Sequence, residues 1–451
     1  MSFAKLFSNP KNRTRLWLIY ISLLFFWGLQ GYAYLGKVYS KGEMFAQIIE
    51  GKPYVSDFIN SYAAARLAQQ CLQIKLSGSP EALPRIYDAA VQARLQNQLI
   101  APVKPESPFY NQYAPVMYLL FLPLSLFSMS HAWLVWCFGT ALAILFILVK
   151  TVLPHYQNLK TKISIPIATF ASFPYWMSFK LGQTSLFLLP DMLLFWHWLA
   201  GGRYFIAGIS ASLVILKLQY LPAIMAIGLA LGRLKFLAGF SSGAIILGTA
   251  CTLLLGVQNI LDFPSALLQG ETGHAVTGVA PEMMQNLRGS LFLFTGQDGK
   301  LEHQIAFAVW LATAIFIYFI FKLEKTASPE KRNLLFASSL CLMLVSSPHC
   351  HMQDYVLLVF ALELIYRTSK CLTIKTESLM PSLALVLAFP ILSWPFFMLM
   401  MVFHFLKIQP FFIYALLTLG TLRGLIQNHH QNLHQDLKKI PGSDHQQDLD
   451  R

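Results

Sequence analysis

Apolar runs of membrane-spanning length recur along the chain, from Leu16 to about Ile426. A helix needs about 20 mainly apolar residues to cross the hydrocarbon core of a bilayer. The composition agrees, because 55% of the residues are hydrophobic and only 12% are charged, whereas soluble proteins carry about 25% charged residues. We therefore predict an all-α polytopic membrane protein whose membrane domain covers residues 1–426, with about 11 to 13 transmembrane or re-entrant segments.

The net charge of +13 would suggest nucleic-acid binding in a soluble chain. Here the basic residues gather in short loops between apolar segments, where they keep loops in the cytoplasm, so we expect no nucleic-acid partner. The N-terminus is basic, which sends residues 16–35 outward and places a long loop, residues 36–112, outside. Residues 257–303 form a second outer loop. The polar residues 427–451 are expected to form a disordered cytoplasmic tail.

The same rule places three hairpin tips on the outer side of the membrane. They lie at KLGQTS (180–185), KLQYLP (217–222) and SPHCHMQD (347–354). Between 113 and 149 two apolar segments occur where the charges allow one crossing, so the segment YAPVMYLLFLPLSLF is expected to be short or re-entrant.

Asp57 opens the sequence DFINSYAAARL just after the first apolar segment. Ser56 or Asp57 is a good N-cap for a helix, because a side-chain oxygen there accepts hydrogen bonds from free backbone N–H groups. A functional role for the Asp57 carboxylate is the alternative. The outer loop is expected to hold two interfacial helices, at about 57–72 and 81–99.

Ionisable side chains within apolar segments are functional candidates, because they are costly to bury without a partner. Lys217 in SLVILKLQYLP either has such a role or extends its ammonium to the interface. Asp191 in LFLLPDMLLFW is expected to be structural, with Lys180 or His197 as its partner.

The 347–354 tip brings His349, His351 and Asp354 within six residues. Two imidazoles and a carboxylate are possible metal ligands, but hydrogen bonding to an anionic head group is favoured, and we predict no metal and no cofactor. Arg288, in the second outer loop, has a guanidinium suited to phosphate.

Several stretches, in this order, resemble elements of glycosyltransferase family 87. They are SDFINSYAAARLA, YAPVMYLLFLPLSLF, LGQTSLFLLPDML, GGRYFIAGISASLVILKLQYLP, NLRGSLF and SSPHCHMQDYVLL. The resemblance covers about residues 16–360.

The resemblance implies a GT-C-type fold and an inverting transfer of a sugar, typically mannose, from a polyprenyl-phosphate donor to a lipid or glycan acceptor outside the membrane. It implies that Asp57 is the general base. Donor phosphate or substrate would be bound by the following residues: Lys217, Arg288, His349, His351, Gln183 and Tyr62. The expected location is a bacterial plasma membrane, with the site facing the periplasm or exterior. A secondary transporter, or a transferase of another lipid-linked sugar such as aminoarabinose or glucose, is the alternative.

Overall fold

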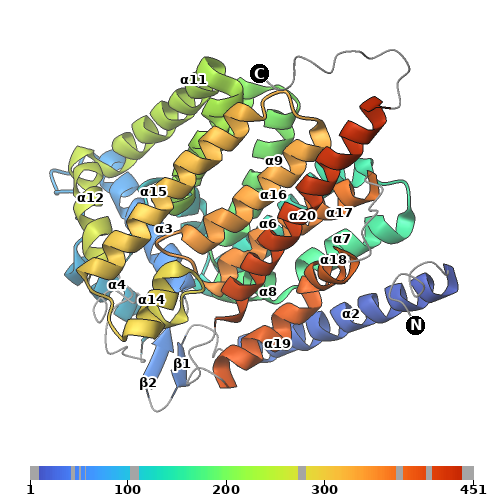
Figure 1. Cartoon of the computed structure of the whole chain (residues 1–451). Helices are drawn as coiled ribbons and strands as arrows, with labels where there is room; N and C mark the ends of the chain where they lie inside the picture. The colour runs from blue at the N-terminus through green and yellow to red at the C-terminus, as the bar shows by residue number, and fades with distance from the viewer. Residues whose placement is uncertain are drawn as a thin grey trace.

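The computed structural model describes residues 10–41, 46–49, 52–55, 57–101, 111–272, 281–371, 379–402 and 409–438. Within these residues the protein is a bundle of helices with one short antiparallel hairpin, β1 (Ala46–Ile49) and β2 (Lys52–Val55), at its lower edge (Figure 1). The predicted all-α polytopic class is therefore confirmed, with this hairpin as a small addition.

The helices of the first half of the chain are α2 (Pro10–Ser40), α3 (Phe58–Ser77), α4 (Ala89–Ile100), α5 (Val116–Phe121), α6 (Met129–Ile147), α7 (Leu159–Ala171), α8 (Phe173–Leu181), α9 (Ser185–Ala200), α10 (Tyr204–Leu213) and α11 (Leu221–Leu255). Those of the second half are α12 (Val257–Thr272), α14 (Leu287–Thr295), α15 (Lys300–Leu323), α16 (Pro329–Ser346), α17 (Val356–Cys371), α18 (Leu379–Leu387), α19 (Phe389–Val402) and α20 (Pro410–Lys438). Short 3-10 turns used below are η1 (Leu122–Leu126), η4 (Val214–Tyr220) and η6 (Met352–Tyr355).

Six helices in the described part of the chain are long and apolar enough to cross a membrane. A seventh crossing results if α18 and α19, which meet at a 74° bend, count as one broken span. The prediction of 11 to 13 segments also counted re-entrant ones, and apolar helices such as Val116–Leu126 and Ser185–Ala200 are too short to cross alone. The segment YAPVMYLLFLPLSLF accordingly forms a short helix, as predicted.

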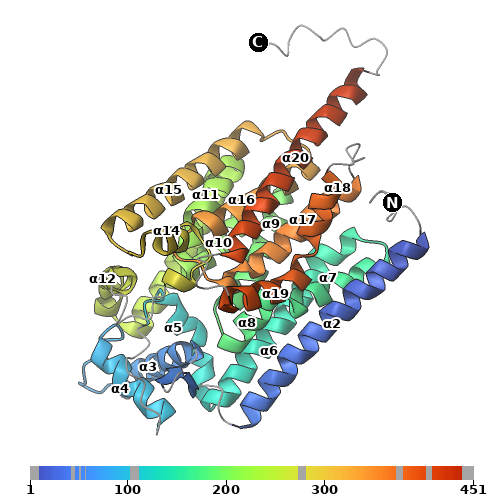
Figure 2. The same cartoon turned by 60° about the horizontal axis from the view of Figure 1, so that its bottom comes forward.

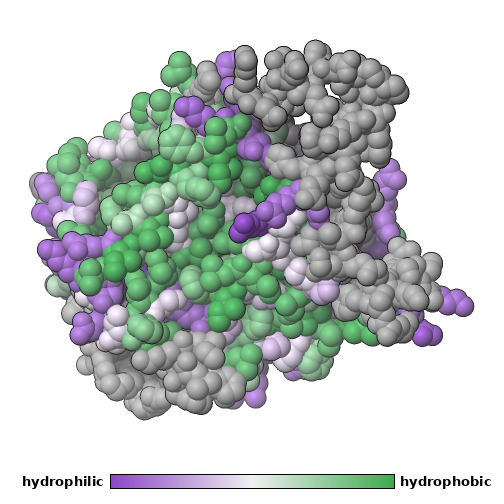
Figure 3. Space-filling model, viewed as in Figure 1, coloured by the Kyte–Doolittle hydropathy of each residue, from purple (hydrophilic) through white to green (hydrophobic). Residues whose placement is uncertain are grey.

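Lipid-facing surface is evident on α15. Figure 3 shows a broad apolar surface over this part of the bundle, with polar side chains gathered at the end where α4 and α12 lie. Large apolar side chains on α15, among them Phe307, Ile315 and Phe319, are more than half exposed. Such a continuous apolar face would be unstable in water and suits the hydrocarbon of a bilayer.

All three predicted hairpin tips are turns in the structure. A Cβ atom at Gly232 would lie 2.9 Å from the Tyr204 ring, so the two ends of Tyr204–Gly232 lie together and the chain reverses at η4. This segment, one of the six counted above, is therefore not a single straight crossing. Lys217, whose backbone is non-helical (φ −135°, ψ 77°), is the break in that segment. The turn between α8 and α9 is made by Gly182, and residues 347–351 join α16 to η6 and α17.

In the first outer loop, helix α3 is packed within the protein. The first eight residues of the helix, Phe58–Ala65, are all buried. Three consecutive alanines on this stretch let α5 and η1 approach the helix closely. Figure 2 shows α3, α4 and α5 gathered at one end of the bundle, with α12 nearby.

The C-terminal tail differs in part from the prediction. Helix α20 continues to Lys438, so the first part of the 427–451 segment is helical rather than disordered. Residues 439–451 lie outside the described residues.

Candidate active site

Asp57 immediately precedes α3, but its carboxylate makes no cap hydrogen bond with the helix. The capping interpretation of Asp57 is therefore wrong, and Ser56 lies outside the described residues. The side-chain amide of Gln183 instead donates to Asp57 Oδ2. The Asp57 carboxylate is therefore not engaged in capping its own helix, and it can act as a base.

Gly182 makes this approach possible. Its φ of +60° is a left-handed conformation, and an added Cβ would lie 2.5 Å from the ring of Phe58, the first residue of α3. Only glycine tolerates both the backbone angle and the contact. The turn that presents Gln183 can therefore lie directly against the start of α3.

Tyr113 continues this chain of hydrogen bonds. Its hydroxyl donates to Gln183 Oε1 at 3.3 Å, and its carbonyl accepts from the Tyr87 hydroxyl at 2.8 Å. Tyr113 was not among the predicted site residues. Its signal in the sequence was the YAP triplet at the start of the short apolar segment, between two polar loops.

The other two tips meet in a buried ion pair. The Lys217 ammonium donates to Asp354 Oδ1, and the Ser185 hydroxyl donates to the same oxygen at 2.5 Å. Burial raises the pKa of Asp354, but the charge of Lys217 and the two hydrogen bonds outweigh it and lower the pKa below its ordinary value. Asp354 thus stays ionised and fixes Lys217. The sequence had suggested Asp354 only as a possible metal ligand.

His349 and His351 lie together at the 347–351 turn, with ring centroids 4.8 Å apart. The Gln219 amide donates to the His349 carbonyl at 3.2 Å, which ties this turn to η4. Burial and the neighbouring His349 lower the pKa of His351 to about 3, so His351 is neutral at physiological pH. It can offer a hydrogen bond there but no positive charge.

The electrostatics of Asp57 tie the three tips to one place. Burial raises its pKa from 3.8 to about 6, while the Gln183 hydrogen bond and then the charges of Lys217 and His349 lower it. Lys217 and His349 are thus close enough to influence Asp57 directly. Asp57, Gln183, Lys217 and His349 therefore lie near one another and are a candidate site.

Two other predicted site residues, Arg288 and Tyr62, have hydrogen-bond partners within the protein. The Arg288 guanidinium is buried and makes a two-pronged ion pair with Asp298, at 2.7 and 3.0 Å. It also donates to the Pro348 carbonyl at 3.4 Å, so it holds the turn that carries His349. The Tyr62 hydroxyl donates to the Phe127 carbonyl at 2.6 Å, which fastens α3 to the chain after η1.

Two further expectations concern metal and Asp191. Within the described residues no three His, Cys, Asp or Glu side chains gather as a metal-binding group. Asp191 is buried and accepts a hydrogen bond from the Ser210 hydroxyl. Its partner is therefore a serine of α10, and not Lys180 or His197 as predicted.

Comparison with known proteins gives one match. The sequence profile of glycosyltransferase family 87 matches residues 111–348, just over half of the 451 residues. Searches of curated proteins and of solved structures found no match.

Proposed function

We infer the function from one premise: the chain belongs to glycosyltransferase family 87 and is a multi-pass membrane protein. It is therefore a glycosyltransferase, and the secondary-transporter alternative is set aside. We propose that it transfers a sugar, with mannose as the expected one, from a polyprenyl-phosphate donor to a lipid or glycan acceptor. We place this reaction on the outer face of a bacterial plasma membrane, from the charge pattern of the loops.

One observation carries the proposal. Asp57 accepts a hydrogen bond from the Gln183 amide, and the charges of Lys217 and His349 are close enough to lower its pKa. In the proposed reaction Asp57 removes the proton from an acceptor hydroxyl, whose oxygen then attacks the anomeric carbon of the donor sugar. The bond between that carbon and the phosphate oxygen breaks, and the configuration inverts. With a pKa of about 6, Asp57 is ionised at neutral pH and is a stronger base than an ordinary aspartate.

A single carboxylate is sufficient for this chemistry. A glycosidic ether needs a general acid to protonate its departing oxygen, whereas a polyprenyl phosphate leaves as a stable anion. The site therefore needs a base on one side of the sugar and positive charge or hydrogen-bond donors on the other.

Lys217 is proposed to meet the developing charge on the phosphate. An ammonium has three N–H donors, and Asp354 accepts from one of them. The pairing fixes the ammonium and leaves donors for a phosphate oxygen. Gln183 and His349 are proposed to bind the donor, with His351 as a neutral hydrogen-bonding group. Arg288 is proposed to act by positioning the 347–351 turn, and Tyr62 by positioning α3.

The decisive experiment uses the purified full chain in proteoliposomes with radiolabelled polyprenyl-phosphate mannose and a bacterial membrane lipid extract. We expect the wild type to form a labelled product and Asp57→Ala to form none. Glu81→Ala, which removes an exposed carboxylate from the same outer loop, should retain activity and is the matched control. Full transfer by Asp57→Ala would remove Asp57 from the mechanism.

The donor sugar is tested in the same assay. Lipid-linked glucose and aminoarabinose are offered in parallel with mannose, and the product is analysed by nuclear magnetic resonance. A product of opposite anomeric configuration to the donor supports inversion, and transfer of glucose alone would replace mannose in the proposal.

A further inference from the structure

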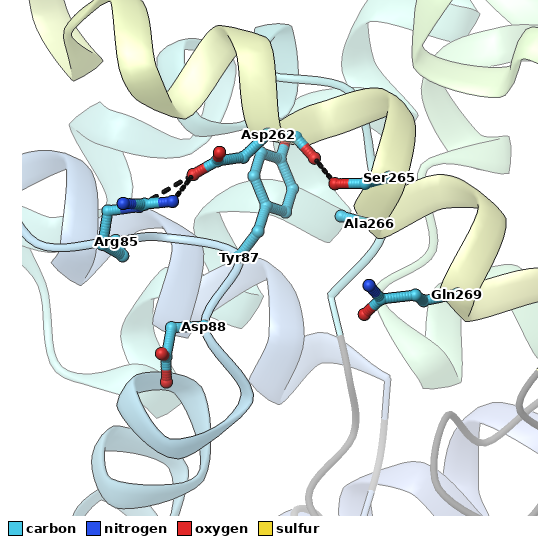
Figure 4. A pocket seen from close by; sticks show the side chains of 7 residues that line it. All are labelled: Arg85, Tyr87, Asp88, Asp262, Ser265, Ala266 and Gln269. Atoms are coloured by element: carbon cyan, nitrogen blue, oxygen red, sulfur yellow. Dashed lines mark hydrogen bonds and ion pairs between the residues drawn. The ribbon is translucent and has the colours of Figure 1, made fainter.

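A pocket of about 330 Å³ lies between the first outer loop and α12 (Figure 4). We call it the outer pocket. It is lined by Arg85, Tyr87, Asp88, Asp262, Ser265, Ala266 and Gln269. Its volume is at the lower end of the range of small-molecule sites, which suits one or two sugar rings better than a lipid tail.

The two walls of the outer pocket are fixed to each other. The Asn259 side chain accepts from the Ile86 amide and donates to the Pro84 carbonyl, both at 3.0 Å. Arg85 makes an ion pair with Asp262 at 2.7 Å. The shape of the pocket thus exists before any ligand arrives, which lowers the entropic cost of binding.

The chemistry of the lining favours a neutral ligand rich in hydroxyl groups. The lining carries one guanidinium against two carboxylates, so an anionic phosphate or carboxylate would be repelled. Carboxylates accept from hydroxyls, whereas amide and guanidinium groups donate to them. Figure 4 shows the Gln269 amide directed into the space beside Ala266 and the Tyr87 ring rising between Arg85 and Ser265. The Tyr87 ring is only 6% exposed and packs against Tyr118 and Phe263, so the polar groups around it supply most of the surface that a sugar would contact.

The outer pocket adjoins the candidate active site through residues 112–113. The Tyr87 hydroxyl, in the pocket wall, donates to the Tyr113 carbonyl, and Tyr113 is bonded to Gln183. Gly270 follows the lining residue Gln269, and any Cβ at position 270 would overlap the Gln112 side chain. Two parts of the pocket wall, at Tyr87 and next to Gln269, therefore lie against the segment that contacts the partner of Asp57.

We propose that the outer pocket binds sugar residues of a glycan acceptor, away from the hydroxyl that reacts. This proposal rests on the proposed function and names part of its substrate: an acceptor with more than one sugar. When sugars are bound in the outer pocket, the next sugar of the acceptor would extend along the 112–113 segment toward Asp57. The pocket would then select the acceptor by its glycan and not by its lipid alone.

The test measures thermal unfolding of the purified full chain with three trisaccharides, mannotriose, maltotriose and chitotriose, each at 10 mM. We expect at least one to raise the unfolding midpoint by about 1–2 °C. Ser265→Trp, which fills the pocket, and Gln269→Ala, which removes its amide, should abolish or strongly reduce this shift. Gln98→Ala removes an exposed amide from α4, outside the pocket, and should leave the shift intact.

Three results would overturn the proposal: no trisaccharide shifts the wild type, the shift survives in both pocket variants, or 5 mM CaCl2 produces the pocket-dependent shift in place of a sugar. Asp57→Ala keeps the outer pocket, so it should retain the sugar-induced shift. A protein that binds the sugar but transfers nothing in the proteoliposome assay would refute the proposed function and leave the pocket assignment standing.

Discussion

Replacing Asp57 with asparagine should abolish transfer and make the protein more stable. Asparagine has the shape of aspartate, and its Oδ1 can still accept from the Gln183 amide, which now donates to the carboxylate. The substitution therefore removes the charge and the basic oxygen and little else. Activity should fall while stability rises, as occurs where an active site holds a group whose burial destabilises the folded protein.

The expected gain follows from the pKa of Asp57, which burial raises from 3.8 to about 6. One pKa unit corresponds to about 1.4 kcal/mol, so ionised Asp57 costs the folded state at most about 3 kcal/mol at neutral pH. The side chain is only half-buried, so solvent screening reduces the expected gain to about 1–2 kcal/mol.

The pH dependence has a definite sign. Because the folded state binds the proton more tightly than the unfolded state, the cost of Asp57 is absent below about pH 3.8. It grows as the pH rises and is complete above the folded-state pKa of about 6. The advantage of Asp57→Asn should therefore be larger at pH 7.5 than at pH 5.

The assay is thermal unfolding of wild type and Asp57→Asn in the same detergent at both pH values, together with sugar transfer. We expect the variant to unfold about 1–3 °C higher at pH 7.5, with a smaller difference at pH 5 and no transfer at either. A variant that unfolds at or below the wild-type temperature at pH 7.5 would show that the Asp57 charge is not buried at a cost.

Three other substitutions test the surroundings of Asp57. Gln183→Ala removes a hydrogen bond that lowers the pKa of Asp57. The transfer rate, which should rise with pH around pH 6 in the wild type, should therefore rise at a higher pH in this variant. An unchanged pH profile would count against Asp57 as the base. Asp354→Ala leaves the buried Lys217 without its partner and should lower the free energy of unfolding by about 3–5 kcal/mol. Adding Lys217→Met should restore part of this loss in thermal unfolding. Equal unfolding temperatures for wild type, Asp354→Ala and the double variant would contradict this pairing. Gly182→Ala places a Cβ at φ +60° against the ring of Phe58. It should lower the free energy of unfolding by about 2 kcal/mol or more and also lower the transfer rate, both measured on the same preparations. Wild-type stability and transfer would show that the turn can move.

The sequence by itself determined the class of the protein and the turns of its chain. Long apolar runs require membrane helices, Gly182 ends α8 at its own position, and Pro222 lies in the first turn of α11, a position that proline favours. Hydropathy, loop charge and helix breakers act over a few residues, so they can be read without knowledge of the fold. The same local signals predict that Asp57 and the three hairpin tips lie on one side of the membrane.

Only the tertiary structure decided which side chains meet. Ser210, and not Lys180 or His197, is the partner of Asp191, and Asp298 occupies the guanidinium of Arg288. A hydrogen bond or ion pair needs two atoms within about 3 Å of each other, and no local pattern states which of several distant partners will reach that distance. Asp57 looked like a helix cap for the same reason: its hydrogen bond with Gln183, 126 positions away, depends on how the turn at Gly182 packs against Phe58 at the start of α3.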